Sequence, residues 1–281
     1  MASRPTLGRL ERTLQALRQG WSQGWPGLPA VVEGCLVELG GPLPQRGTRR
    51  AHLLHEATLA TAYWLERDGA QRARHGAEPA YHNRLHTADT LVALTTLLRA
   101  QRAAEQRATA PVTPAERLGL LAMAAHDLLH DGSINRFEAE LESRSADHLQ
   151  PLLAELEISP RDARRVRTLI LATDPAHVPG VHARVRGRRF RVEDDDCLAV
   201  LLVEADILAS TLADTGVSLT AQLALEWDRV APERAQALRQ PLGRLGFLER
   251  AALFSSPASA LLGLPAVRQA QIDALRAAQG G

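Results

Sequence analysis

Apolar residues recur along most of the chain at the three- and four-residue spacing of amphipathic α-helices. Leucines at positions 7, 10, 14 and 17 show this pattern from the start. The spacing and several longer apolar stretches predict helices over residues 7–17, 50–67, 81–98, 114–125, 137–156, 160–171, 197–212, 219–238, 242–254 and 267–278. No two segments alternate between apolar and polar residues as paired strands would. We therefore expect an all-α fold, a compact bundle of about ten or more helices.

Two of these helices have clear start signals. Thr113-Pro114-Ala115-Glu116 and Ser159-Pro160-Arg161-Asp162 each combine a capping hydroxyl, a proline in the first turn and an acidic residue. Residues 20–47 are instead rich in glycine and proline, which predicts an irregular segment around a short apolar insert, Val31 to Leu39. We expect residues 1–49 to form an N-terminal helical lead-in, as a cap or a homodimer contact, and residues 50–281 to carry the function within a single domain.

Composition narrows the classes of function. Alanine, leucine and arginine dominate while valine and isoleucine are sparse, which favours helices. The 33 basic and 32 acidic residues leave a formal charge of +1, unlike the basic surface that a nucleic-acid polymer requires. No stretch approaches 18 uninterrupted apolar residues, so no membrane partner is expected. Cys35 and Cys197 are far apart and form no disulfide framework, which fits a cytoplasmic protein.

The stretch Ala124–Asn135 contains the first candidate chemistry. It ends an apolar run with His126, Asp127 and His130, followed by a glycine. If the helix continues, the two histidines lie on one face because they are four residues apart. Imidazole and carboxylate side by side suit a divalent cation. A polar helix end near water, with histidine favoured by the helix dipole, is the alternative explanation.

A second histidine pair lies in Tyr81–Asp89. His82 and His86 are again four residues apart, here at the start of a predicted helix. The dipole at that end disfavours an imidazolium, so a neutral imidazole there is suited to bind a cation or transfer a proton. N-capping together with one exposed histidine explains a single histidine better than it explains two.

Asp206 adds a carboxylate in an unusual place. It lies, with Glu204, inside the almost wholly apolar stretch Cys197–Leu212. A carboxylate in such surroundings is costly unless it is paired or bound to a metal. A buried ion pair is one explanation; completion of the cation site by Asp206 is the one we favour.

Taken together, these motifs resemble the catalytic domain of the class I cyclic nucleotide phosphodiesterases, within the HD-domain metal-dependent phosphohydrolases, and indicate a bacterial member. The resemblance covers about residues 80–255 and rests on Tyr81-His82-Asn83-x-x-His86-x-x-Asp89, His126-Asp127-x-x-His130-x-Gly132-x-x-Asn135, Thr173-Asp174 and Ala205-Asp206. It implies a cytoplasmic enzyme with an HD-type helical bundle whose catalytic domain occupies residues 50–281.

The resemblance implies two divalent metals. His86, His126, Asp127 and Asp206 match the ligands of the tighter metal, usually Zn²⁺. Asp127 also matches the carboxylate that bridges to a second metal, usually Mg²⁺ or Mn²⁺. Two such metals clamp phosphoryl oxygens and lower the pKa of a water for in-line attack.

The resemblance also implies a catalytic histidine. His82 matches the residue that protonates the leaving oxygen, and Glu142 matches the glutamate that steadies this histidine and the metal waters. General-acid help of this kind is typical for an alkoxide leaving group. The positions matched to the surroundings of the second metal's waters are His130, Thr173 and Asp174.

The substrate pocket departs from the family pattern. Tyr81 and Phe247 match substrate-binding positions, but Arg244 replaces the glutamine that reads a purine. A guanidinium only donates hydrogen bonds, so Arg244 suits a carbonyl-rich base, a carboxylate or a phosphate. We expect hydrolysis of a small phosphoester, foremost a 3′,5′-cyclic nucleotide. Another nucleotide or phosphoester is the alternative substrate, and an HD-type di-iron oxygenase or a ligand-binding sensor is a third reading.

Overall fold

The computed structural model describes residues 5–21, 23–40 and 48–279. All regular secondary structure in these ranges is helical, which confirms the all-α prediction. The helices are α1 (Leu7–Gly20), α2 (Leu28–Gly40), α3 (Arg49–Arg74), α4 (Arg84–Ala104), α5 (Pro114–Ala125), α6 (Glu140–Glu155), α7 (Pro160–Leu171), α8 (Val178–Arg184), α9 (Asp195–Thr211), α10 (Ala213–Trp227), α11 (Pro232–Leu238), α12 (Pro241–Arg250), α13 (Pro257–Leu262) and α14 (Leu264–Gln279).

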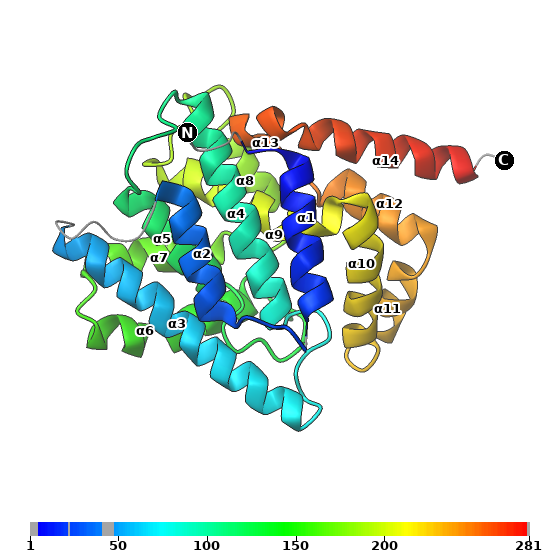
Figure 1. The fold of residues 1–281 in the computed structure, drawn as a ribbon. Helices are drawn as coiled ribbons and strands as arrows, with labels where there is room; N and C mark the ends of the chain where they lie inside the picture. Colours follow the sequence, from blue (N-terminus) through cyan, green and yellow to red (C-terminus); the bar gives the residue numbers. More distant parts are fainter. Residues whose placement is uncertain (1–4, 22, 41–47, 280–281) are drawn as a thin grey trace.

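Helices α4 and α9 form the centre of the bundle. α4 runs through the middle of Figure 1 and packs against α1, α2, α5, α9 and α13. Both helices are buried on nearly all sides, as expected for helices without a broad polar face. Their central position brings the start of α4 close to the middle of α9.

Helix α5 lies against α3, α7 and α9. Its Gly119 faces α9 so closely that an added Cβ would lie 3.0 Å from Leu198 Cδ1. The predicted N-cap at Thr113 is confirmed and forms a capping box, since Thr113 Oγ1 accepts from the Glu116 amide and the Glu116 carboxylate accepts from the Thr113 amide. This packing brings the C-terminus of α5 to the same region as α4 and α9.

The prediction of an irregular segment over residues 20–47 is wrong for residues 28–40, which form α2. Leu28, Val32 and Leu36 lie on its buried face and pack with α3 and α4. Gly27 and Gly40, with positive φ values of 85° and 141°, mark the two ends of the helix, whereas Gly34 lies within it. Residues 41–47 of that segment lie outside the described residues.

Other predicted boundaries also change. α3 continues to Arg74 instead of ending near residue 67, because Gly69 allows the Arg84 side chain to pass close to its backbone. The predicted helix 219–238 is divided into α10 and α11, since Pro232 starts a new helix. α6 begins at Glu140, after Ala139 in a left-handed conformation with φ 52°.

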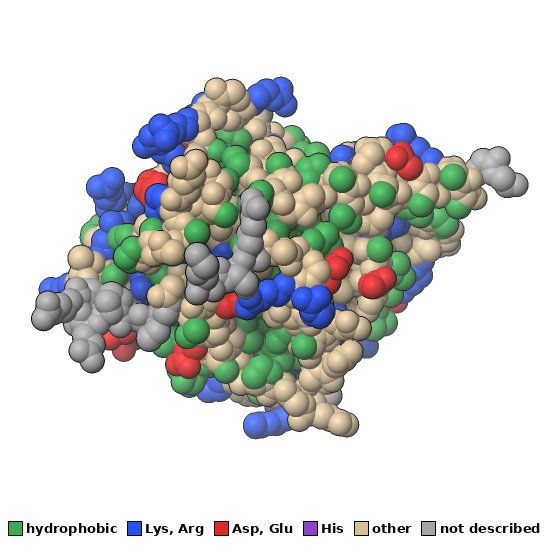
Figure 2. All heavy atoms as spheres, turned by 45° about the horizontal axis from the view of Figure 1, so that its top comes forward, with side chains coloured by type: hydrophobic (Ala, Val, Ile, Leu, Met, Phe, Trp, Pro, Cys, Tyr) green, Lys and Arg blue, Asp and Glu red, His purple; other side chains and the backbone are tan. Residues whose placement is uncertain are grey.

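The surface carries mixed side chains. The face in Figure 2 shows arginines in small separate groups among hydrophobic and uncharged side chains. α14 extends along one edge of the molecule to the C-terminal end (Figure 1). Among the described helices, none combines the length and apolar character needed to cross a bilayer.

Candidate metal centre

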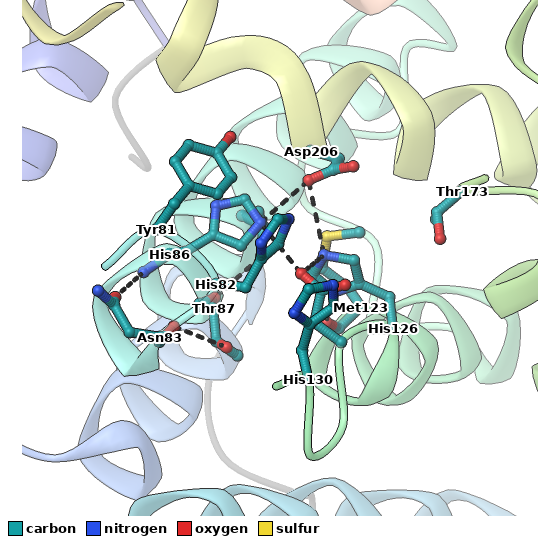
Figure 3. Close-up of polar contacts among 12 residues, drawn as sticks. Tyr81, His82, Asn83, His86, Thr87, Met123, His126, His130, Thr173 and Asp206 are labelled. Carbon is teal, nitrogen blue, oxygen red and sulfur yellow. Dashed lines mark hydrogen bonds and ion pairs between the residues drawn. The ribbon is translucent and has the colours of Figure 1, made fainter. Parts of the chain in front are cut away.

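Four side chains converge where α4, α5 and α9 meet. His86 belongs to the first turn of α4, His126 caps the C-terminus of α5, Asp127 follows it, and Asp206 lies in α9. Figure 3 shows His86, His126 and Asp206 pointing toward one another. His86 and His126 are 3% and 2% exposed, so the cluster is well shielded from water. These are the four residues predicted as ligands of the tighter metal.

The separations within the cluster match a coordination sphere. His86 Nε2 lies 3.3 Å from Asp127 Oδ2 and 3.2 Å from Asp206 Oδ1. His126 Nε2 lies 3.1 Å from Asp127 Oδ2 and 3.5 Å from Asp206 Oδ1. Ligand atoms about 2.0–2.1 Å from a tetrahedral Zn²⁺ are themselves about 3.3–3.4 Å apart. His86, His126 and Asp127 have donor atoms that all lie within 4.8 Å of one another, so these three could hold one cation. Asp206 Oδ1 borders this group through its contacts with both imidazoles.

The orientation of His126 supports this fit. Its Nδ1–H donates to the backbone carbonyl of Met123 at 2.8 Å, which fixes the ring and directs Nε2 into the cluster. His126 Nε2 is buried and has no hydrogen-bond partner among the described residues. A buried nitrogen lone pair facing two carboxylates is what a metal ligand requires.

The electrostatics indicate a site for positive charge. Burial alone would lower the pKa of His86, but Asp127 and Asp206 outweigh it and raise that pKa to about 9. Burial would raise the pKa of Asp206, yet the contacts with His126 and His86 lower it below its usual range. Protons on the histidines thus occupy the place of a cation, and metal binding must release them.

His82 stands beside this cluster as part of a separate pair. Its Nδ1 lies 2.5 Å from Glu226 Oε1, while Glu226 Oε2 accepts from the backbone N–H groups of Tyr81 and His82 at 2.8 and 2.9 Å. Glu226 is in the last turn of α10. The carboxylate fixes the imidazole orientation and leaves Nε2 outside this contact.

The prediction that Glu142 steadies His82 is therefore wrong, because Glu226 makes that contact. Glu142 instead accepts from Asn135 Nδ2 at 2.9 Å. Burial raises the pKa of its carboxyl group. Sequence reasoning missed Glu226, which is 144 residues away from His82 and lies in no recognisable motif.

His130 contacts His82, the imidazole of the His82–Glu226 pair. Its ring stacks on that of His82 with centroids 3.9 Å apart. The Nδ1 atom accepts from the Gly132 amide at 3.0 Å, and burial and then the charge of His82 lower the His130 pKa to about 3. α5 ends at Ala125 and Leu129 has φ 61°, so the expectation that His126 and His130 share a helix face is wrong.

His82, His130 and Glu226 also have ligand atoms close enough to hold a metal. The Glu226 carboxylate, however, already accepts from three N–H groups, and His130 Nδ1 accepts from Gly132. These contacts satisfy the trio without an ion. We therefore interpret these three residues as a hydrogen-bonded group that fixes the His82 ring, and not as a metal site.

A pocket of about 320 Å³ opens onto both groups, and its lining includes Asp127, Glu142, Thr173, Asp174 and Asp206. Thr173 donates its hydroxyl hydrogen to the Ile170 carbonyl at 2.7 Å. Asp174 accepts from the amides of Ala139 and Ala176, which anchors the start of α6. Thr173 lies to one side of the cluster in Figure 3, without a direct contact to its four donors.

Two of the residues predicted to bind substrate, Arg244 and Phe247, lie outside this pocket. Arg244 is 9% exposed and donates to the backbone carbonyls of Ser210, Thr211 and Leu212 and to Gln271 Oε1. Its guanidinium therefore closes the C-terminus of α9, and the prediction that it meets substrate is wrong in this geometry. It also lies 5.5 Å from the Phe247 ring centroid.

Tyr81 packs against His86, one of the four clustered residues, outside the lining of the main pocket. Its hydroxyl is 3.0 Å from Ser210 Oγ, and its ring centroid is 4.7 Å from that of His86. Tyr81, Arg244 and Phe247 line a separate cavity of about 50 Å³. Tyr81 thus supports a metal ligand rather than lining the main pocket.

Known proteins supply no further assignment, because no family model matches the chain and no curated protein matches it in sequence. The functional interpretation rests on these residues and their geometry.

Proposed function

We propose that the protein is a metal-dependent phosphoester hydrolase, foremost a 3′,5′-cyclic nucleotide phosphodiesterase. The observation that carries the proposal is one pocket lined both by three of the clustered donor residues, His126, Asp127 and Asp206, and by His82. The Nδ1 atom of His82 is held by Glu226 outside that lining. A cation site beside an oriented imidazole is what hydrolysis of a phosphoester with a poor leaving group needs.

His86, His126, Asp127 and Asp206 would hold a divalent cation, and their donor set of two imidazoles and two carboxylates suits Zn²⁺. Mg²⁺ or Mn²⁺ beside Asp127 is the second ion implied by the resemblance. When bound, such ions polarise a phosphoryl group and lower the pKa of a water to about 7.

The chain's own residues account for the proton. Glu226 accepts from His82 Nδ1, so Nε2 is the nitrogen that can donate to the leaving oxygen. His130 stacks on the same ring and limits its rotation. The apolar side chains Ile134 and Leu141 in the pocket lining reduce the water around the reacting groups.

Hydrolysis of a different phosphoester is the second candidate, favoured by one observation. Arg244, at the position of the family's purine-reading glutamine, is engaged with backbone carbonyls. The substrate must then be recognised elsewhere, and its identity need not follow the family.

The third candidate function, an HD-type di-iron oxygenase, has less support. His177 binds the Leu171 carbonyl and Glu138, and His182 binds Ser255 Oγ. Neither lines the pocket with the four clustered donors.

The deciding experiment is a panel of cyclic and linear nucleotides assayed with Zn²⁺ plus Mg²⁺ or Mn²⁺. We expect turnover that is abolished by a chelator and restored by the metals. If the metal-loaded protein hydrolyses no phosphoester, the proposal is wrong.

A further inference from the structure

The pocket has two chemically different ends. One set of lining side chains comprises the carboxylates of Asp127 and Asp206 and the imidazole of His82, all partly buried. The other comprises Pro175 and Arg234, which are exposed and therefore mark the rim, and the partly buried Trp227. A substrate whose phosphoester lies at the first set would therefore extend its remaining part toward the rim.

Arg234 is the one arginine in this lining. It lies in α11, is exposed, and makes no hydrogen bond or ion pair with any described residue. By contrast, Arg239 after the same helix forms a two-bonded ion pair with Asp228 at 2.6 and 2.7 Å. The five N–H donors of Arg234 are thus free for a ligand.

Trp227 provides a second, independent donor. It is the last residue of α10, directly after Glu226. Its indole Nε1 is buried and has no acceptor among the described residues. Leaving such a group unpaired costs about 1–3 kcal/mol, so a ligand acceptor at this place would be favourable.

Both polar side chains from this segment, Arg234 and Trp227, are donors only. We propose that they bind the end of the substrate remote from the phosphoester, and that this end carries hydrogen-bond acceptors. This proposal rests on the proposed function, and it moves substrate recognition from Arg244 to α10 and α11. Two ligand features share this chemistry: the O6 and N7 edge of guanine and a second phosphate group.

Adenine fits less well. Its corresponding edge offers one acceptor, N7, beside an amino donor, N6. A guanidinium facing that amino group would have a donor opposite a donor. Discrimination by one bidentate arginine contact is worth about 1–3 kcal/mol, or roughly 5- to 150-fold in kcat/KM.

Two matched pairs of substrates test the proposal with the metal-loaded full chain. Cyclic GMP and cyclic AMP differ only in the base, whereas adenosine 3′,5′-bisphosphate and adenosine 5′-monophosphate differ in a second phosphate. We expect the acceptor-rich member of at least one pair to be favoured about tenfold or more in kcat/KM. The pair that shows the preference identifies which acceptor is bound.

The variant Arg234→Ala should reduce that preference roughly 5- to 150-fold. Trp227→Phe, which keeps an aromatic ring but removes the N–H, should reduce it by a smaller factor. Arg229→Ala is the matched control, because Arg229 is exposed nearby and does not line the pocket. Equal rates within both pairs, or a preference that survives Arg234→Ala, would overturn the proposal.

Bis(p-nitrophenyl) phosphate has neither a base nor a second phosphate. Its hydrolysis therefore distinguishes failure of the proposed recognition by Arg234 and Trp227 from failure of the proposed function. Its hydrolysis by the unaltered protein, without any acceptor preference among nucleotides, refutes only the recognition by Arg234 and Trp227. No turnover of this ester or of any nucleotide refutes the proposed function and this inference with it.

Discussion

Replacing His82 by alanine separates proton donation from metal binding. His82 is hydrogen-bonded to Glu226 and stacks on His130. Within the described residues its ion-pair partner is Glu226 and none of the four clustered donors. The variant leaves Glu226 with its contact to the Tyr81 amide and leaves every metal ligand in place. We therefore expect kcat for a cyclic nucleotide to fall about 10²- to 10⁴-fold, the usual contribution of a general acid.

The assay measures kcat together with the metal content of the purified variant. Zinc per chain should stay at the level of the unaltered protein. With bis(p-nitrophenyl) phosphate the loss should shrink to about tenfold or less, because nitrophenolate departs without a proton. His148→Ala is the control, since His148 is an exposed histidine of α6 away from the pocket. Equal losses on both substrates, or loss of zinc, would refute the role assigned to His82.

Three further outcomes follow from the same contacts. Glu226→Gln should lower kcat roughly 10- to 100-fold, which corresponds to the loss of one hydrogen bond to a charged group. The zinc content should be retained. Kinetics and metal analysis of the same sample measure the rate and the zinc content. The pKa of the metal-free His86 is raised to about 9, so zinc must displace a proton from it at any lower pH. The affinity of the protein for zinc should therefore increase at least about tenfold per pH unit between pH 6 and pH 8. Competition with a chelator measures this affinity. Arg244→Ala should lower the free energy of unfolding by about 1–3 kcal/mol without altering zinc content, because it removes the guanidinium donor to the Ser210 carbonyl. The Thr211 and Leu212 carbonyls keep the Gln271 side chain and the Gly216 amide as donors. Denaturant unfolding at pH 7 tests this, and an unchanged midpoint would contradict it.

The four clustered residues could be selected from the sequence because each lies in a short stretch whose chemistry is unusual for its surroundings. That they bind a metal stays a prediction. Asp206 in an apolar helix and His126 at the end of an apolar run are both conspicuous locally. Their convergence needed only the packing of three long helices. The helical fold was predictable for the same reason, since apolar periodicity is a local property.

The contacts of Glu226 and Arg244 could not be predicted from the sequence around them. Glu226 belongs to a polar helix, and only the path of α10 brings its carboxylate to His82. Arg244 stands where the family has a substrate-reading residue, but the sequence does not reveal that backbone carbonyls of α9 use its donors. Arg234 and Trp227 likewise become a pair only when the α10–α11 connection places both in the pocket lining.

The helix errors have related causes. α2 was missed because glycine and proline at its flanks outweighed a short apolar run, whereas burial against α3 and α4 stabilises it. α3 extends beyond the predicted end at residue 67, and Gly69 within the extension provides space for the Arg84 side chain. In both cases tertiary packing overrides the local preference of the chain.

The most direct test of the central claim is a crystal structure of the zinc-loaded protein with anomalous data at the zinc edge. We predict one strong peak per chain, about 2.0–2.2 Å from His86 Nε2, His126 Nε2 and the carboxylates of Asp127 and Asp206, and its loss in Asp206→Ala. A chain that takes up no zinc, or a peak held by other side chains, would contradict the account.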